Sequence, residues 1–279
     1  MKHVEGHEVD YVLGHSEQEL ERISTQARRF EAFTRQVFQL AGVGSGMRVL
    51  DVGSGAGDVA FLAAELVGST GSVIGTDKVQ TAVALAHARM SSKGLRNVAF
   101  RKGDPTEMIF ERPFDAIVGR MILMHCGDSP AMLRKLAAQV QPGGIMVFVE
   151  PAWSFARSLP LVPLYERCCQ WIVHAFRTAG VETEMGTKLH SAFVAAGLPG
   201  PSMQMYPIIG GPAAALDWLR GIAGIVNTMQ SEIIRLGLAT TEEVDSTTLV
   251  GRLHAEAVAT DSVIIAPGMV GAWARVSRS

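Results

Sequence analysis

The sequence predicts an α/β domain with a doubly wound, mostly parallel sheet. Short β-branched and aliphatic runs alternate with helical patterns from residue 48 to residue 149, and this alternation is typical of parallel sheets covered by helices. The stretch from Arg48 to Ala60, RVLDVGSGAGDVA, places a buried strand, a glycine turn and a helix start in direct succession. Hydrophobic residues make up 48% of the 279 residues and charged residues 19%, which suits one large packed domain and argues against a disordered chain.

The first part of the chain is expected to form an arm followed by a helix. Its leading residues are polar and predict a loosely held arm. A helix is predicted to begin at Ser16, because Ser16 and Glu19 have the spacing of a capping box, and to end at Gly42. We assign residues 1–44 to this arm and cap helix and residues 45–279 to the main domain.

The core of the main domain is predicted to contain five parallel strands whose carboxyl ends meet at one edge, where ligands bind in this fold class. Ser129 and Pro130 predict the N-cap and first turn of a helix that runs to Val140. A second helix is predicted over Val79–Met90. The predicted strands cover Arg48–Val52, Ser72–Thr76, Val98–Lys102, Phe114–Val118 and Ile145–Val149, with Pro142, Gly143 and Gly144 breaking the helix before the last of them.

The second half predicts two more strands and a helical cap. The last run, Met269–Val276, is expected to be antiparallel, and insertions at about 151–200 and 211–262 are expected to cover the ligand edge. Thr240 and Glu243 have capping-box spacing. The other predicted elements are helices at Leu164–Gly180, Met185–Gly197, Ala213–Leu236 and Thr241–Val258, and a strand at Ser202–Ile209.

The glycine turn predicts a cofactor site, because glycines let the backbone approach a ligand and the helix start presents unpaired N–H groups. From Gly55 the sequence GAGDVA fits the dinucleotide pattern G-x-G-x-x-A, with Asp77 downstream for a ribose. From Asp51 it fits D-x-G-x-G-x-G. The glycines alone leave both alternatives open.

Four further features, in order along the chain, carry a family resemblance. Asp77 ends the second strand, Gly103-Asp104-Pro105 follows the third, Phe114-Asp115-Ala116-Ile117-Val118 forms the fourth, and Pro142-Gly143-Gly144 precedes the fifth. Together with the first turn, this series resembles the class I S-adenosylmethionine-dependent methyltransferases, especially the small-molecule branch that includes ubiquinone-biosynthesis-type enzymes. The resemblance covers roughly residues 45 to 150. It implies a seven-stranded sheet and S-adenosylmethionine as the cofactor, whereas a nicotinamide site gives no comparable account of Asp104 or of residues 142–144.

The resemblance also implies roles for particular residues. Asp77 would accept hydrogen bonds from both ribose hydroxyls, and Asp104 would bind the adenine amino group. Arg120 would pair with the methionine carboxylate of the cofactor, while Lys78 is either a solvated surface group or a neighbour of the adenine. The full set of expected cofactor-binding residues is Gln26, Gly53, Ser54, Gly55, Asp77, Lys78, Asp104, Pro105 and Arg120.

His125, which follows the fourth strand, is the best single candidate for a general base, because the ordinary pKa of histidine lies near neutrality. Methyl transfer itself needs mainly alignment of the reactants and exclusion of water. Other polar and aromatic residues are candidates for the substrate side, although most are expected to be packing or surface positions. They are Tyr11, His15, Glu150, Trp153, Tyr165 and His174.

Composition and charge limit the classes of partner that we expect. The net charge is −2, without a cluster of Lys and Arg, so nucleic acid is not an expected partner. The chain shows no signal sequence and no run that spans a bilayer, and its three cysteines predict a reducing cytoplasm and no disulfide framework. His3, His7 and His15 do not predict a metal site.

We therefore expect a methyltransferase acting on a small molecule with a hydrophobic or aromatic body, with a homodimer as one oligomeric state to test. The alternatives are a nicotinamide-dependent oxidoreductase and a non-catalytic S-adenosylmethionine-binding protein.

Overall fold

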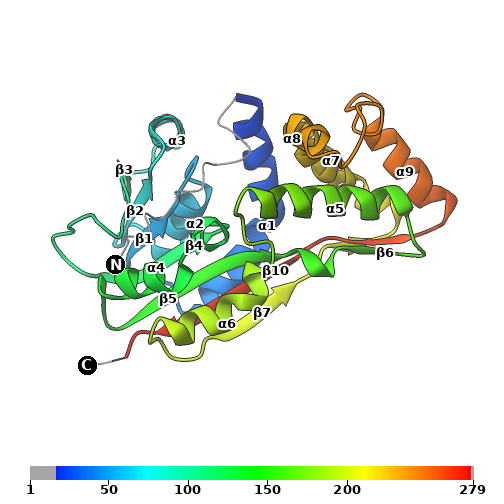
Figure 1. Ribbon diagram of the computed structural model, residues 1–279. Coiled ribbons are helices and arrows are strands. Elements are labelled where there is room, and N and C mark those ends of the chain that lie inside the picture. The colour runs from blue at the N-terminus through cyan, green and yellow to red at the C-terminus, as the bar shows by residue number, and fades with distance from the viewer. Residues whose placement is uncertain (1–16, 278–279) are drawn as a thin grey trace, which may run out of the picture.

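The computed structural model describes residues 17–277, with side chains from residue 29 onward. A seven-stranded sheet runs through the molecule (Figure 1) in the order β3-β2-β1-β4-β5-β10-β7. Neighbouring strands from β3 to β5 pair in parallel, and β10 pairs antiparallel with both β5 and β7. The predicted fold class is confirmed. The strands are β1 (Arg48–Val52), β2 (Ser72–Asp77), β3 (Val98–Lys102), β4 (Phe114–Arg120), β5 (Val140–Ala152), β7 (Ser202–Tyr206) and β10 (Gly268–Arg275).

Helices cover both faces of this sheet. A Cβ on Gly271 would meet Val37 of α1, whereas one on Gly186 of α6 would meet Val270. Since successive strand residues point to opposite faces, α1 and α6 lie on opposite sides of β10. These layers bury the core around Phe38 and Phe148. The helices of the layers are α1 (Glu17–Ala41), α2 (Asp58–Val67), α3 (Gln80–Ser92), α4 (Ser129–Ala137) and α6 (Met185–Ala195).

The helix predicted from Ser129 to Val140 is shorter than expected. Its N-cap is Asp128, whose carboxylate accepts a hydrogen bond from the Ala131 N–H at 2.8 Å, whereas the Ser129 hydroxyl donates to the Leu123 carbonyl. The helix ends at Ala137, and residues 142–144 lie inside β5, near a register shift against β4. The prediction that these residues break a helix was therefore wrong: they belong to the irregular start of a long strand.

The cap is a group of four helices beside the sheet (Figure 1), in which α5 packs against α7, α8 and α9. The segment predicted as one cap insertion, 151–200, contributes α5 to this group but α6 to a sheet layer. The boundary predicted between residues 44 and 45 stays a prediction. The cap helices are α5 (Pro163–Thr178), α7 (Pro212–Thr228), α8 (Gln230–Arg235) and α9 (Leu249–Ala259).

Two cap helices differ from the prediction. The helix predicted at Ala213–Leu236 is divided at Met229 into α7 and α8. The capping box does form, since the Thr240 N–H donates to Glu243 at 2.9 Å and the Glu243 N–H to the Thr240 hydroxyl at 3.3 Å. It closes only a turn, however, because the Asp245 carboxylate accepts bonds from the next two threonines and delays the helix until Leu249.

A second, three-stranded antiparallel sheet was not predicted. The strand predicted to run to Ile209 ends at Tyr206, and the chain then enters this smaller sheet. Its strands are β6 (Arg157–Leu159), β9 (Val263–Ile265) and β8 (Ile209–Gly210). No helix among residues 17–277 combines the length and the apolarity needed to cross a bilayer.

Candidate active site

The glycine turn after β1 forms the floor of the candidate site. Gly53 and Gly55 have φ values of 66° and 50°, a region that side chains other than glycine rarely adopt. A Cβ on Gly53 would overlap the Ile122 side chain, whereas one on Gly55 would have open space around it. The Ser54 N–H donates to the Thr76 carbonyl at 2.8 Å and so ties the turn to β2.

Asp77, at the end of β2, joins this turn to the next helix. One carboxylate oxygen accepts a hydrogen bond from the Gly55 N–H at 2.9 Å, and the other accepts one from the Val79 N–H at 2.9 Å. Each carboxylate oxygen retains a further lone pair for a ligand hydroxyl. The carboxylate therefore serves local structure and is also fixed beside the glycine turn.

Asp104 lies on the neighbouring strand end, because the Gly103 N–H donates to the Asp77 carbonyl at 2.9 Å. Burial disfavours its ionised form, but hydrogen bonds from the Thr106 hydroxyl and N–H and from Lys78 outweigh this effect and lower the pKa of Asp104. Lys78 pairs with the Asp104 carboxylate at 3.2 Å. Pro105 is buried, and its carbonyl accepts a bond from Gln139.

Asp51 is a functional candidate that the sequence analysis did not single out. It is 1% exposed, and neither carboxylate oxygen has a hydrogen-bond partner within the described part of the chain. Burial raises the pKa of Asp51. The positive charge of Arg120 and the N–H of Ala60 both act to lower this pKa, but the Ala60 N–H lies outside hydrogen-bond geometry. The available signal was its place as the first residue of the D-x-G-x-G-x-G pattern.

Arg120 provides a half-buried positive charge at the end of β4. Its guanidinium donates to the Thr34 hydroxyl of α1 at 3.1 Å. Burial lowers the pKa of Arg120, while the carboxylates of Asp58, Asp51 and Glu31 favour its charged form.

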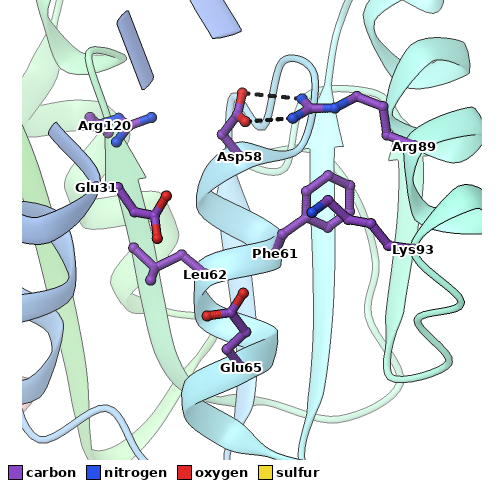
Figure 2. A pocket seen from close by; sticks show the side chains of 8 residues that line it. All are labelled: Glu31, Asp58, Phe61, Leu62, Glu65, Arg89, Lys93 and Arg120. Carbon is purple, nitrogen blue, oxygen red and sulfur yellow. Dashed lines mark hydrogen bonds and ion pairs between the residues drawn. The ribbon is translucent and has the colours of Figure 1, made fainter. Parts of the chain in front are cut away.

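Figure 2 shows Arg120 and Asp58 at one end of a crevice of about 70 Å³ along α2. Asp58 is held by two bonds from Arg89, at 2.7 and 3.2 Å. Glu31 lines the crevice beside Arg120, Glu65 lies further along α2, and Arg35 pairs with both glutamates.

His125 lies in the short 3-10 helix η1 (Leu123–His125), which follows β4. Burial lowers its pKa to about 4, so the imidazole is neutral at neutral pH. A base is most effective when its pKa lies near the operating pH, and His125 would therefore be a weaker base than an ordinary histidine.

Glu150, expected on the substrate side, is fully buried instead. Its carboxylate accepts hydrogen bonds from the N–H groups of Ile122 at 2.9 Å, Leu123 at 2.8 Å and Met124 at 3.3 Å. Burial raises the pKa of Glu150 to about 7, even though these bonds favour the carboxylate.

Two other residues expected on the substrate side also lie in the core. The Trp153 ring packs edge-on against Phe176, with the ring centroids 6.0 Å apart. The Tyr165 hydroxyl donates to the Ile265 carbonyl at 2.8 Å and accepts a bond from the Trp218 indole at 3.0 Å. Both side chains are therefore fixed by packing.

His174 is exposed and lines a second hollow, which is open to solvent and has a volume of about 510 Å³, on the carboxyl-terminal half of α5. The lining residues in the described part of the chain are Gln170, Val173, His174, Arg177 and Thr178. Tyr11 and His15 lie outside the described residues, as does the side chain of Gln26, whose backbone is part of α1. Within the described residues, no group of three His, Cys, Asp or Glu side chains is arranged to hold a metal ion.

Comparison with known proteins identifies the family. A family model for the methyltransferase domain matches residues 44–193, which is more than half of the chain. The chain belongs to this methyltransferase family. The predicted resemblance to class I S-adenosylmethionine-dependent methyltransferases of the small-molecule branch is confirmed.

Individual relatives match part of the chain. It is 36% identical over 111 residues to arsenite methyltransferase from Aquipseudomonas alcaligenes, an alignment that covers 37% of this chain and 32% of the relative. It is 31% identical over 135 residues to aklanonic acid methyltransferase DauC from Streptomyces sp. strain C5, an alignment that covers 48% of this chain and 61% of the relative. The chain thus spans between about a third and three fifths of these relatives.

The fold matches solved methyltransferases along most of the chain. Phosphoethanolamine N-methyltransferase 2 from Haemonchus contortus, solved with S-adenosyl-L-methionine, superposes with a TM-score of 0.54 over 89% of this chain and 53% of that chain. The sequence identity is 17%, so this likeness concerns the fold alone.

Proposed function

We propose that the protein is an S-adenosylmethionine-dependent methyltransferase that acts on a small organic molecule with an apolar or aromatic body. The observation that carries this proposal is the pair of opposite charges at the ligand edge, the buried Asp51 and the half-buried Arg120. The carboxylate of Asp51 has no hydrogen-bond partner among residues 29–277, and each group favours the charged form of the other.

These charges fit the amino-acid end of S-adenosylmethionine. The Asp51 carboxylate and the buried Ser54 hydroxyl would accept hydrogen bonds from its ammonium group, and Arg120 would pair with its carboxylate. Asp77 would bind the ribose hydroxyls and Asp104 the adenine. When bound, the cofactor supplies a methyl group on a sulfonium, and the chain's task is to orient the acceptor and exclude water.

A nicotinamide dinucleotide fits less well. Its pyrophosphate would approach the glycine turn next to the buried carboxylate of Asp51, and like charges in a low-dielectric site repel strongly. The family match also gives no support to an oxidoreductase.

The cavity on α5 supports an acceptor site in the cap. The segment after α5 reaches the loop that follows β4, because the Glu182 N–H donates to the Met124 carbonyl at 2.8 Å. Among the described residues, this hollow is lined by one face of α5 and is open to solvent, and its volume of about 510 Å³ is within the range for small-molecule sites.

The cap is also where acceptor preference would be set. The family match ends at residue 193, before α7, α8 and α9, and the relatives are named for acceptors as different as arsenite and aklanonic acid. A base role for His125 stays a prediction, and so do a cytoplasmic location and a homodimer.

Calorimetry tests the cofactor assignment. We expect S-adenosylhomocysteine to bind and the oxidised nicotinamide cofactor not to bind. Asp77→Ala should weaken S-adenosylhomocysteine binding by about 1.5–3 kcal/mol, the cost of removing a charged hydrogen-bond partner. Asp217→Ala is the control, because Asp217 is an exposed carboxylate in a surface ion pair with Arg220.

Equal affinity of wild type and Asp77→Ala would remove the role of Asp77, and preferential nicotinamide binding would support the oxidoreductase. Tight binding of S-adenosylhomocysteine without methyl transfer to any of a panel of phenols, quinols, thiols and amines would support the non-catalytic alternative.

A further inference from the structure

Glu150 caps a loop from a neighbouring strand. Its side chain is 0% exposed, and it lies 26 to 28 residues along the chain from the three N–H groups that it binds. Those groups belong to Ile122, Leu123 and Met124, at the start of η1. The first N–H groups of a helix have no partner within the helix, so one carboxylate satisfies three donors in a buried place.

A space-filling role does not explain a glutamate at this position. Burying a carboxylate costs free energy even when it is hydrogen-bonded, and the raised pKa of Glu150 reflects that cost. A leucine would fill a similar volume without the cost but would leave three buried N–H groups unpaired. The structure therefore uses the carboxylate to fix backbone positions.

The loop that Glu150 fixes touches the cofactor site on one side. The Ile122 side chain lies so close to Gly53 that a Cβ at residue 53 would overlap it. Directly before Ile122, Met121 has a φ of 54°, a left-handed conformation that costs free energy in a residue other than glycine. The chain thus turns sharply out of β4 onto the glycine turn.

The same loop touches the acceptor side. Its last helical residue is His125, and the Met124 carbonyl accepts the bond from Glu182, which follows α5. The segment from Met121 to His125 therefore lies between the glycine turn and the end of the helix that lines the larger cavity.

We propose that Glu150 is a positioning residue of the methyltransferase: its carboxylate holds residues 122–124 so that Ile122 and His125 meet the cofactor and the acceptor in reactive geometry. This inference rests on the proposed function. Glu150 touches neither ligand, and it acts through the backbone that it binds.

Two variants separate hydrogen bonding from volume. Glu150→Leu keeps the size but accepts no bonds, and we expect kcat to fall by roughly 100-fold, as small misplacements at a reacting centre do, with the Kd for S-adenosylhomocysteine changing much less. Glu150→Gln keeps one oxygen for the Ile122 and Leu123 N–H groups, so it should recover most of the lost kcat. Asp128→Ala is the matched control, because it removes a carboxylate cap from α4 and should lower stability but not kcat.

Amide hydrogen exchange gives a readout that does not depend on activity. In Glu150→Gln, exchange should accelerate at the Met124 N–H and stay near wild type at Ile122 and Leu123. In Glu150→Leu it should accelerate at all three. Wild-type exchange at the Met124 amide in Glu150→Gln, wild-type exchange at all three amides in Glu150→Leu, or a uniform increase along the whole chain would overturn the inference.

The two hypotheses fail in distinguishable ways. If the wild type binds no S-adenosylhomocysteine, the proposed function fails while the exchange experiment still reports on the loop. If the wild type transfers methyl groups and Glu150→Leu does so at the same kcat, only the positioning role fails.

Discussion

Asp51 is a residue at which stability and binding make opposite demands. Its carboxylate is buried, lacks a hydrogen-bond partner among the described residues and has a raised pKa. The attraction of Arg120 does not outweigh the cost of burial, so the net effect of the surroundings is to disfavour the charge. A group retained at such a cost is a candidate for a binding role.

Replacing Asp51 with Asn should therefore stabilise the free protein and weaken cofactor binding. Because the folded-state pKa is raised, the unfolding free energy of the wild type falls as the pH rises above the ordinary pKa of an aspartate. The gain from Asp51→Asn should grow with pH and reach on the order of 1–3 kcal/mol near neutrality. Urea unfolding at several pH values measures the gain, and calorimetry with S-adenosylhomocysteine measures the loss.

The exposed Asp217→Asn is the control, and it should alter neither quantity. A less stable Asp51→Asn protein at neutral pH would show that the carboxylate has a partner that stabilises it.

At the scale of elements, η1 brings together the buried Glu150 and the half-buried His125, two groups with opposite pH behaviour. Burial raises the pKa of Glu150 to about 7, above its unfolded value of 4.5. Burial lowers the pKa of His125 to about 4, below its unfolded value of 6.5. The contribution of Glu150 to the unfolding free energy therefore decreases as pH rises from 4.5 to 7. The contribution of His125 increases as pH rises from 4 to 6.5.

These two contributions should nearly cancel in the wild type. Each of these two pKa shifts corresponds to a change of about 3 kcal/mol in the unfolding free energy. Glu150→Gln removes the falling contribution, so its unfolding free energy should rise with pH relative to that of the wild type across this range. His125→Asn removes the rising contribution, so its unfolding free energy should fall with pH relative to that of the wild type. Denaturant unfolding of both variants at three pH values tests this, and parallel pH profiles would refute the assignment of the two shifts.

At the scale of the whole molecule, one hydroxyl joins three parts of the cap. Tyr165 of α5 donates to the Ile265 carbonyl in β9 and accepts a bond from Trp218 in α7. The second sheet and the helix group are thereby linked at one buried point.

Tyr165→Phe should loosen the cap without changing acceptor recognition. The variant leaves the indole N–H of Trp218 and the Ile265 carbonyl without this partner in a buried place, which costs about 1–3 kcal/mol. The unfolding free energy should fall by that amount, while KM for any accepted substrate stays near wild type. A large change in KM with unchanged stability would instead place Tyr165 in the acceptor site.

The sequence by itself determined the parallel core and the place of its ligand edge. The strands beginning at Arg48, Ser72 and Val98 were predicted at or within a residue of their observed ends, because burial pattern and glycine punctuation are local signals. The same local pattern put Asp77 and the glycine turn next to each other, since consecutive parallel strands end at one edge.

Only the tertiary structure decided the contacts that depend on distant partners. The short-range pattern at Ser129 gave no reason to prefer Asp128 as the cap, and nothing near Glu150 shows that it binds N–H groups 26 to 28 residues away. The second sheet likewise pairs residue 157 with residue 265. Whether a polar side chain lines a cavity, caps a helix or packs in the core depends on what the folded chain places against it, and that is a property of strand order and helix packing rather than of local sequence.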